Sequence, residues 1–210
     1  MNAPASSVIA VVVRLLTGAS VCWAGCRPEL RQRVYFGNHT SHVDSLLVWS
    51  ALPPAIRVLT RPVGAGDYWG GPNPARRLLT RFFGAVLINR DCSGTAERER
   101  QVETLLNALG HRYSLILFPE GTRGDGPGIA PFKSGLYYLS LRQPGLELMP
   151  VSLDNVRRIL PKGEVLPVPM TCRVTFGSPM TLGAAEPKGA FLERAREAVR
   201  RLSPREDTAC

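Results

Sequence analysis

Short apolar runs alternate with segments of helical periodicity along this chain. The apolar runs have the length of strands and lie at 33–37, 56–60, 85–89, 114–118, 146–153 and 172–176. Apolar side chains that recur every three or four positions predict helices at 43–52, 74–83, 95–109, 133–141 and 189–202. The alternation predicts an α/β fold, a single domain whose mixed central sheet is flanked by helices on both faces. The unbroken apolar run at 114–118 is typical of a strand that is covered on both faces.

Loops interrupt this pattern without dividing the chain. Residues 61–72 are rich in glycine and proline and predict a loop around Tyr68 and Trp69. No linker or internal repeat is visible, and 210 residues suit one compact domain of ordinary size. We therefore expect an N-terminal apolar segment at 1–25, a folded domain at 26–203 and a frayed tail at 204–210.

The N-terminal segment is mainly apolar from Val8 to Trp23, and Arg14 is its only charged residue. Its 16 residues are fewer than the roughly 20 that a spanning helix needs. A secretory signal is not indicated, because no basic residue precedes the apolar run. We expect a membrane-associating helix that lies in the lipid interface, with Arg14 reaching toward water and Trp23 at the headgroup level. An ordinary core helix capped by Ser6 or Ser7 is the alternative.

The predicted helix at 74–83 is a second candidate for membrane contact. Its apolar side chains are Leu78, Leu79, Phe82 and Phe83, and its cations are Arg76, Arg77 and Arg81. A basic amphipathic helix suits an anionic membrane surface. A helix that faces the core and keeps a solvated basic face fits the same pattern equally well.

The overall charge is strongly positive, with a formal net charge of +9 and a pI near 9.9. Such a surface attracts anionic lipid, an acidic carrier protein or nucleic acid. Nucleic acid is the weakest of the three, because the chain carries no recognisable reader motif and its arginines accompany apolar faces.

The five cysteines give no sign of a disulfide framework or a metal site. Their number is odd, and no Cys-x-x-Cys pair or Cys/His ligand spacing occurs. We therefore expect reduced thiols in a reducing compartment and no bound metal.

The segment Asn-His-Thr-Ser-His-Val-Asp at 38–44 joins a predicted strand to a predicted helix. His39 can accept a proton near neutral pH, and a carboxylate such as Asp44 can fix its tautomer and stabilise the imidazolium. On one continuous helix a separation of five residues would point these side chains about 140° apart. The pair therefore requires His39 in the turn before the helix and Asp44 in its first turn.

Other polar residues of this segment give weaker signals. Ser41 and Ser45 do not lie in a nucleophile elbow, which favours direct deprotonation of a substrate hydroxyl over a covalent enzyme intermediate. His42 competes with His39 for the role of base, although we expect it to be structural. Asn38 has the character of a turn or cap residue.

Two arginines end predicted strands and are candidates for phosphate binding. Arg90 follows the run at 85–89, and Arg123 belongs to the turn after the run at 114–118. Ligands of α/β proteins commonly lie at such strand ends, and a guanidinium binds phosphate by charge-assisted bonds. Lys133 can add positive charge, although a lysine at the start of a helix is usually solvated.

The turn that contains Arg123 reads Phe-Pro-Glu-Gly-Thr-Arg at 118–123. Gly121 permits close approach of a ligand to the backbone, and Thr122 adds a hydrogen-bond donor. Glu120 would repel a phosphate, so a hydroxyl or an arginine is its expected partner.

These segments together resemble the glycerolipid acyltransferase superfamily and, within it, the lysophosphatidic acid (1-acylglycerol-3-phosphate) acyltransferases. The four motifs of the family match Asn38, His39 and Asp44, then Gly84, Ile88 and Arg90, then 118–123, and finally 149–151. They occur in the family order. Gly124 stands where the family commonly has serine, and Met149 replaces the usual branched residue.

The resemblance implies an enzyme of phospholipid biosynthesis without a cofactor. His39 would take a proton from the free hydroxyl of lysophosphatidic acid, Asp44 would orient His39, and the oxygen would attack an acyl-CoA or acyl-carrier protein thioester. The implied acceptor site consists of Arg90, Glu120, Gly121, Thr122 and Arg123. Asn38, Lys133 and Pro150 are further candidates, with an oxyanion site near Pro150.

The implied location is the cytoplasmic side of the cell membrane, with peripheral or monotopic attachment. The implied partners are a lysophospholipid, an acyl thioester, the membrane surface and, as one possible donor, acyl-carrier protein. An acyl chain needs an apolar tunnel, for which the candidates are Leu46, Leu47, Trp49, Phe82 and Phe83.

Two rivals remain open from the sequence. One is an acyltransferase or transacylase for a different lysophospholipid. The other is a basic protein without enzymatic activity that docks on anionic membranes through its first helix and residues 74–83.

Overall fold

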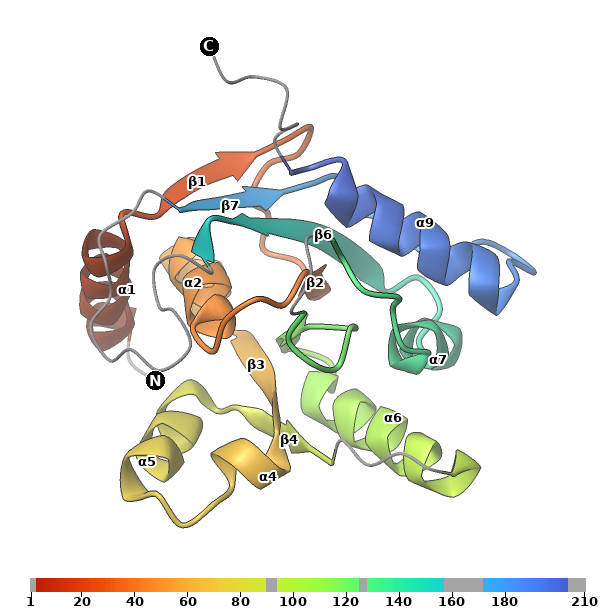
Figure 1. The fold of residues 1–210 in the computed structure, drawn as a ribbon, viewed down its shortest axis with the longest axis horizontal. Helices are drawn as coiled ribbons and strands as arrows, with labels where there is room; N and C mark the ends of the chain where they lie inside the picture. Colours follow the sequence, from red (N-terminus) through yellow and green to blue (C-terminus); the bar gives the residue numbers. More distant parts are fainter. Residues whose placement is uncertain (1–2, 90–93, 125–127, 157–171, 204–210) are drawn as a thin grey trace.

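The computed structural model describes residues 3–89, 94–124, 128–156 and 172–203 (Figure 1). They form one α/β domain around a seven-stranded sheet in the order β1-β7-β6-β2-β5-β3-β4. The strands are β1 Ser20–Trp23, β2 Arg33–Gly37, β3 Thr60–Ala65, β4 Val86–Ile88, β5 Ser114–Leu117, β6 Glu147–Asp154 and β7 Arg173–Phe176. All neighbours pair in parallel except β6 and β7, so the sheet is mixed as predicted.

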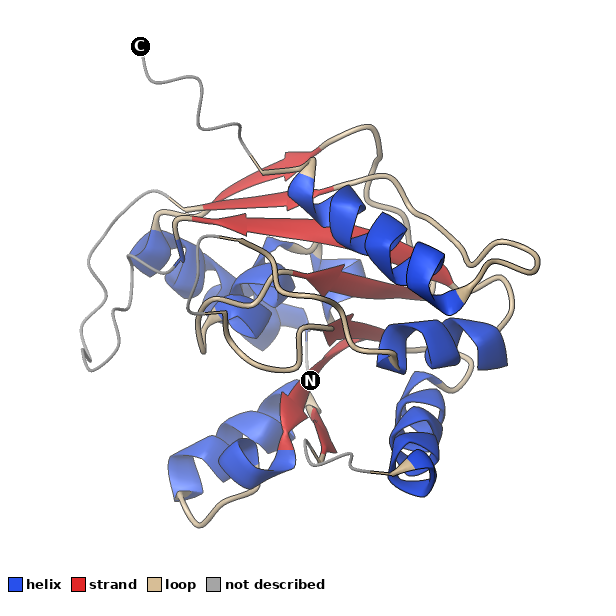
Figure 2. Ribbon diagram, turned by 45° about the vertical axis from the view of Figure 1, so that its right-hand side comes forward, coloured by secondary structure: helices blue, strands red, loops and turns tan. Residues whose placement is uncertain are grey.

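Helices cover both faces of the sheet (Figures 1 and 2). One side carries α1 Ala3–Thr17, α2 Asp44–Ala51, α3 Pro54–Arg57, α4 Gly66–Trp69 and α5 Pro74–Phe83. The other side carries α6 Thr95–Leu109, α7 Gly135–Arg142 and α9 Lys188–Arg200. The two layers predicted from the alternating pattern are therefore confirmed.

The central strand β2 is buried along its whole length because both faces of the sheet are covered. Its side chains alternate between two hydrophobic cores. Tyr35 packs in the core beneath α1 and α2, whereas Val34 and Phe36 pack in the core beneath α6, α7 and α9. This period of two explains why the run could be apolar at every position.

The region after α2 differs from the sequence prediction. Residues 56–60 were expected to form a strand, but Pro54 begins the short helix α3 and the strand starts only at Thr60. Proline suits the first turn of a helix, because its missing N–H would have no partner there. The expected loop at 61–72 is also wrong, since β3 pairs with β5 up to Pro62 and with β4 from Val63 onward.

The N-terminal segment divides into a helix and a strand. The helix ends at Thr17, and Gly18 takes the left-handed conformation (φ 58°) that commonly terminates helices. Ser20–Trp23 then pairs with β7 in the sheet, so the helix makes up only part of the expected segment 1–25. Trp23 stacks on Phe176 with ring centroids 4.2 Å apart, and its expected place among lipid headgroups stays a prediction.

No helix among the described residues is long and apolar enough to cross a membrane. Five large side chains of α1 nevertheless remain exposed, namely Val8, Val11, Val12, Leu15 and Leu16. The opposite face of the helix packs against α2 and α3, with Ala10 buried. One stripe of α1 therefore holds the helix to the domain, and the other stripe faces outward.

Candidate active site

His39 and Asp44 lie together at the carboxyl end of β2. His39 Nδ1 is 2.8 Å from Asp44 Oδ2, and the Asp44 side chain is completely buried. Because a carboxylate only accepts hydrogen bonds, Nδ1 carries the proton and Nε2 is the nitrogen that can act as a base. The imidazole ring stacks on Phe118 at a centroid distance of 4.6 Å, which fixes its plane.

The strand-to-helix turn produces this pair. Helix α2 begins at Asp44, as the spacing required, and His39 lies in the turn before it. Asp44 Oδ2 also accepts hydrogen bonds from the backbone N–H groups of Thr40 and Ser41, at 2.6 and 2.8 Å. The carboxylate therefore folds the turn back on itself and orients the imidazole with the same oxygen.

The turn at 118–123 holds the backbone of His39 from the other side. Glu120 Oε1 accepts a hydrogen bond from His39 N at 2.7 Å, and Gly124 N donates to His39 O at 3.0 Å. The second oxygen of Glu120 accepts from Ala130 N at 2.9 Å. Glu120 is 4% exposed, and both of its carboxylate oxygens accept hydrogen bonds from backbone N–H groups. It therefore stabilises the turn, whereas the sequence had suggested contact with the acceptor.

Gly124 does not exclude the serine that the family commonly has at this position. A Cβ atom there would meet Glu120 Oε2 at 3.5 Å and His39 O at 3.9 Å, which are ordinary contacts. The departure from the family pattern therefore leaves the geometry of the turn unchanged.

Glycine is required at position 121 by the left-handed backbone conformation and by the nearby Lys133 side chain. Its φ is 73°, and a Cβ atom would lie 2.7 Å from Lys133 Nζ. The lysine side chain thus lies directly over the turn, and Lys133 N donates to Pro119 O at 2.7 Å. This arrangement brings the ammonium group to the edge of the sheet where His39 lies.

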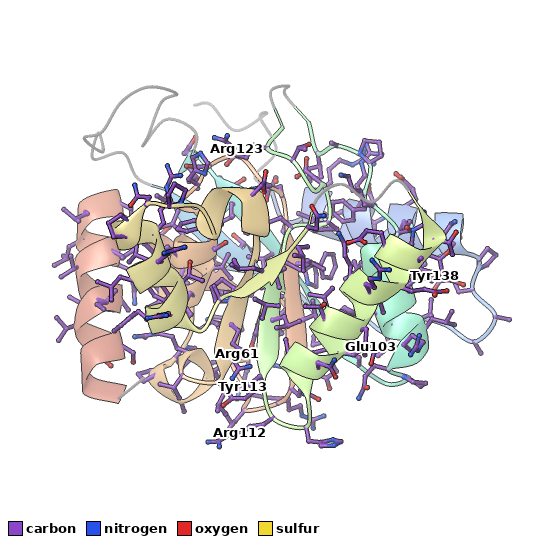
Figure 3. The ribbon with its side chains drawn as sticks, turned by 90° about the horizontal axis from the view of Figure 1, so that it is seen from below. Arg61, Glu103, Arg112, Tyr113, Arg123 and Tyr138 are labelled. Atoms are coloured by element: carbon purple, nitrogen blue, oxygen red, sulfur yellow. The ribbon has the colours of Figure 1, made fainter. Side chains whose placement is uncertain are left out.

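Other cations surround the same edge. Thr122 and Arg123 are exposed on the turn, and Figure 3 shows Arg123 at one end of the molecule. The pKa of His42 is lowered by burial first, and then by neighbouring groups that include the guanidinium groups of Arg123 and Arg76. These groups are therefore near enough to form one region of positive potential, which favours an anionic ligand. Arg90 lies outside the described residues.

Asn38 and Pro150 have structural positions. The Asn38 side chain donates to Leu153 O at 2.9 Å and accepts from Leu153 N at 2.8 Å, which fastens the end of β2 to β6. Pro150 is buried inside the sheet opposite Phe36. The next residue, Val151, pairs with Gly37 at the end of β2, and the expected oxyanion site near Pro150 stays a prediction. Within the described ranges, no cluster of His, Cys, Asp or Glu side chains could bind a metal ion.

A cavity of about 370 Å³ opens beside His39 on the α6 side of the sheet, and we call it the mixed cavity. Its apolar floor includes Val63, Val102, Leu105 and Leu117. Its polar lining consists of His39, Asn89, Arg98, Gln101, Lys133 and Ser134. A ligand that enters it meets a candidate base, two cations and an apolar surface.

A larger cavity of about 550 Å³, the apolar cavity, lies on the opposite side among α1, α2 and α5. Four of the five expected tunnel residues line it, namely Leu46, Trp49, Phe82 and Phe83. Leu47 does not, because it is fully buried in the core behind α2. His42 and Val43, which follow the His39 turn, line the same cavity and bring it close to the base.

Sequence reasoning missed the polar residues that α6 contributes to the mixed cavity, Arg98 and Gln101. Both belong to α6, whose first half alternates arginine and glutamate in a manner typical of a solvated helix. No local signal separates Arg98 from Arg100. Only the packing of α6 beside β4 and α7 shows which one faces the cavity.

Comparison with known proteins agrees with this arrangement. The Acyltransferase family model matches residues 27–154, which include β2, the His39 turn and the turn at 118–123. The chain belongs to the Acyltransferase family. That match extends from before β2 to the end of β6 and therefore includes both the catalytic candidates and their structural supports.

Curated relatives are 1-acyl-sn-glycerol-3-phosphate acyltransferases. The chain is 28% identical to one from Limnanthes alba over 169 residues, which is 79% of this chain and 57% of the relative. It is 32% identical to the human beta form over 135 residues, 59% of this chain and 41% of the relative. The chain thus spans about half the length of the curated relatives it matches.

A crystal structure supports the same fold. The 1-acyl-sn-glycerophosphate acyltransferase of Thermotoga maritima superposes with a TM-score of 0.71, covering 95% of this chain and 77% of that one. The sequence identity is 18%, so this likeness establishes the α/β architecture alone.

Proposed function

We propose that this protein transfers a fatty acyl group from a thioester to the free hydroxyl of lysophosphatidic acid. The observation that carries the proposal is the His39–Asp44 pair, joined at 2.8 Å and open to a cavity with cations on its rim. The family membership and the names of the relatives support the same reaction and the same acceptor.

The proposed chemistry needs one proton acceptor. Nε2 of His39 takes the hydroxyl proton as the oxygen attacks the thioester carbonyl, while Asp44 stabilises the imidazolium. The tetrahedral intermediate then collapses, the C–S bond breaks, and the thiolate leaves with the proton held by His39. The products are an ester and a free thiol, and no cofactor or covalent enzyme intermediate takes part.

The two cavities suggest how the substrates divide. The apolar cavity presents little polar surface to a ligand, which suits a long acyl chain that must leave water. The mixed cavity contains His39 and Lys133, which suits a hydroxyl and a phosphate on one molecule. We assign the acyl chain of the donor to the apolar cavity and the acceptor to the mixed cavity, with the carrier either CoA or acyl-carrier protein.

Attachment to a membrane surface is part of the proposal. The exposed leucines of α5, Leu78 and Leu79, border the apolar cavity, and Ile9 of α1 borders it as well. Figure 1 shows α1 and α5 on the same side of the domain. Arginines accompany both apolar faces, so an anionic membrane facing a reducing compartment is the proposed location.

The experiment that tests the reaction is mass spectrometry of the purified protein with mixed substrates. Acyl-CoA, acyl-carrier protein and phospholipid are each supplied as sole donor, together with a panel of lysophospholipid acceptors. We expect phosphatidic acid to form from lysophosphatidic acid and a thioester. Product from phospholipid alone would instead favour a transacylase, and product from another acceptor would move the assignment to that lysophospholipid.

The rival without enzymatic activity gives a different result. It expects binding to anionic vesicles and no acyl transfer from any donor. Vesicle sedimentation beside the substrate panel therefore separates a docking protein from an enzyme that works at the membrane.

A further inference from the structure

Arg98 lines the mixed cavity although no motif contains it. It lines the mixed cavity together with His39 and Lys133, from a helix distant from both in sequence. Among the described residues, no carboxylate forms an ion pair with Arg98 or Lys133. Two cations thus share one cavity, and within the described residues no acidic partner neutralises them.

The guanidinium of Arg98 lies near an aromatic ring of the neighbouring helix α7. Its Cζ atom lies 5.7 Å from the centre of the Tyr138 ring on α7, and Lys188 Nζ of α9 lies 5.8 Å from the same ring. Figure 3 shows Tyr138 beside α6. A guanidinium that lies over an aromatic ring keeps its hydrogen-bonding edge available to a ligand.

The neighbouring arginine of the same helix behaves differently. Arg100 is 77% exposed, pairs with Glu97 at 3.3 Å and does not line the cavity. The two residues have the same chemistry and lie one turn or less apart on α6. Arg98 therefore faces the cavity, whereas Arg100 faces solvent.

Resting on the proposed function, we propose that Arg98 selects the headgroup of the acceptor. Its guanidinium and the ammonium of Lys133 bind a phosphate monoester while the hydroxyl of the same molecule reaches His39. The apolar floor around Val102 and Leu105 receives the first part of the acceptor's acyl chain. A choline or ethanolamine headgroup would bring its own positive charge against these cations, which disfavours zwitterionic lysophospholipids.

The test compares Arg98→Gln with Arg100→Gln. We expect Arg98→Gln to raise KM for lysophosphatidic acid by about 10- to 100-fold, the effect of losing a hydrogen bond to a charged group. The KM for the donor and the kcat should stay within about twofold. Arg98→Lys should recover part of the loss, and Arg100→Gln should behave as the wild type.

The preference for one acceptor over another gives a second measurement. A purely structural role of Arg98 would not change that preference. Arg98→Gln should narrow the preference for lysophosphatidic acid over lysophosphatidylcholine by about the same 10- to 100-fold. An unchanged KM and an unchanged preference would overturn the proposal, and so would an equal loss in Arg100→Gln.

Direct binding separates this inference from the reaction itself. Calorimetry with glycerol 3-phosphate on the His39→Ala protein, with and without Arg98→Gln, needs no turnover. Weaker binding after Arg98→Gln supports the phosphate contact even if the wild type acylates a different acceptor. Equal binding, or no binding to either protein, rejects the role of Arg98, while acyl transfer by the wild type would still support the proposed function.

Discussion

The two ends of strand β2 use similar groups for different purposes. At its carboxyl end, Asp44 holds His39, and the imidazole faces a cavity. At its amino end, Glu147 holds Arg33 at 2.6 Å, and the arginine side chain is only 3% exposed. In each pair a carboxylate binds a nitrogen of its partner at short distance. Only the His39 pair leaves a second nitrogen that faces a cavity.

The difference lies in what surrounds each pair. Arg33 also pairs with Glu29 at 3.0 Å, and Glu147 also pairs with Arg31 at 3.1 Å. This network fastens β2 to the neighbouring strand β6 and has no cavity beside it among those described. The comparison teaches that an ion pair at a sheet edge indicates function only when one partner keeps an accessible group.

Figure 3 shows the same division across the whole domain. Arg123 lies at one end of the molecule, and Arg61, Arg112 and Tyr113 lie at the other. Arg61 stacks on the Tyr113 ring at 3.4 Å from its centre, so that cation is used for packing. Positive charge at the amino ends of the strands therefore supports the fold, and positive charge at the carboxyl ends surrounds the candidate site.

The largest expected effect comes from the buried acid at the carboxyl end. Asp44→Asn keeps an oxygen for the backbone N–H groups but removes the charge that stabilises the imidazolium. We expect kcat to fall by about 10²–10⁴-fold, as for the loss of general-base assistance. Steady-state rates and thermal melting of the purified variant measure it, and a kcat within threefold of the wild type in a folded variant would break the comparison.

A smaller effect, on stability alone, is expected at the amino end. Glu147→Gln removes the charged partner of a buried arginine and should cost about 1–3 kcal/mol of unfolding free energy. The kcat at neutral pH should not change, because Glu147 lies at the opposite end of the sheet from His39. Thermal unfolding measures the first effect and the transfer assay the second; a large loss of kcat would mean that the two ends are coupled.

The pH dependence of stability sharpens this contrast. Burial raises the pKa of Glu147, but the hydrogen bond and charge of Arg33, followed by those of Arg31, outweigh it and lower the pKa overall. The resulting stability is present above the unfolded pKa of about 4.3 and is lost as the pH falls through the lower folded value. The difference in Tm between wild type and Glu147→Gln should therefore be constant near neutrality and shrink below about pH 4.

The smallest expected effect concerns the apolar cavity. Leu46→Trp places a larger side chain in the cavity and should reduce transfer of long acyl chains by about tenfold, the cost of about two displaced methylene groups. Rates with a series of donor chain lengths measure it, and a short-chain donor is the internal control. Equal loss for every chain length would mean that this cavity does not receive the acyl chain.

The sequence located the candidate base, His39, but not the residues that support it. The strand at 33–37 and the turn that begins α2 follow from local apolar pattern and spacing, so the His39–Asp44 geometry could be predicted. The task of Glu120 could not, because its partners His39 and Ala130 become neighbours only when β5 lies beside β2. Local pattern also failed at β3, where pairing with two different strands overrides a composition rich in glycine and proline.

The local sequence pattern also could not predict which residues line the mixed cavity. Arg98 and Arg100 are equivalent in a helix taken alone, and the contact with Tyr138 depends on how α6 packs against α7. The expectation for Leu47 failed for a related reason, because neighbouring leucines of α2 point to different sides. Leu46 faces the apolar cavity and Leu47 faces the core.

The most direct test of the central claim is the turnover of His39→Ala with acyl thioester and lysophosphatidic acid, both at saturation. The variant should fold, because Glu120 and Gly124 hold the backbone of residue 39 and not its side chain. We predict a kcat about 10²–10⁴-fold below that of the wild type, in a variant whose cooperative thermal melting shows that it is folded. A folded His39→Ala protein that transfers acyl groups at the wild-type rate would contradict the account.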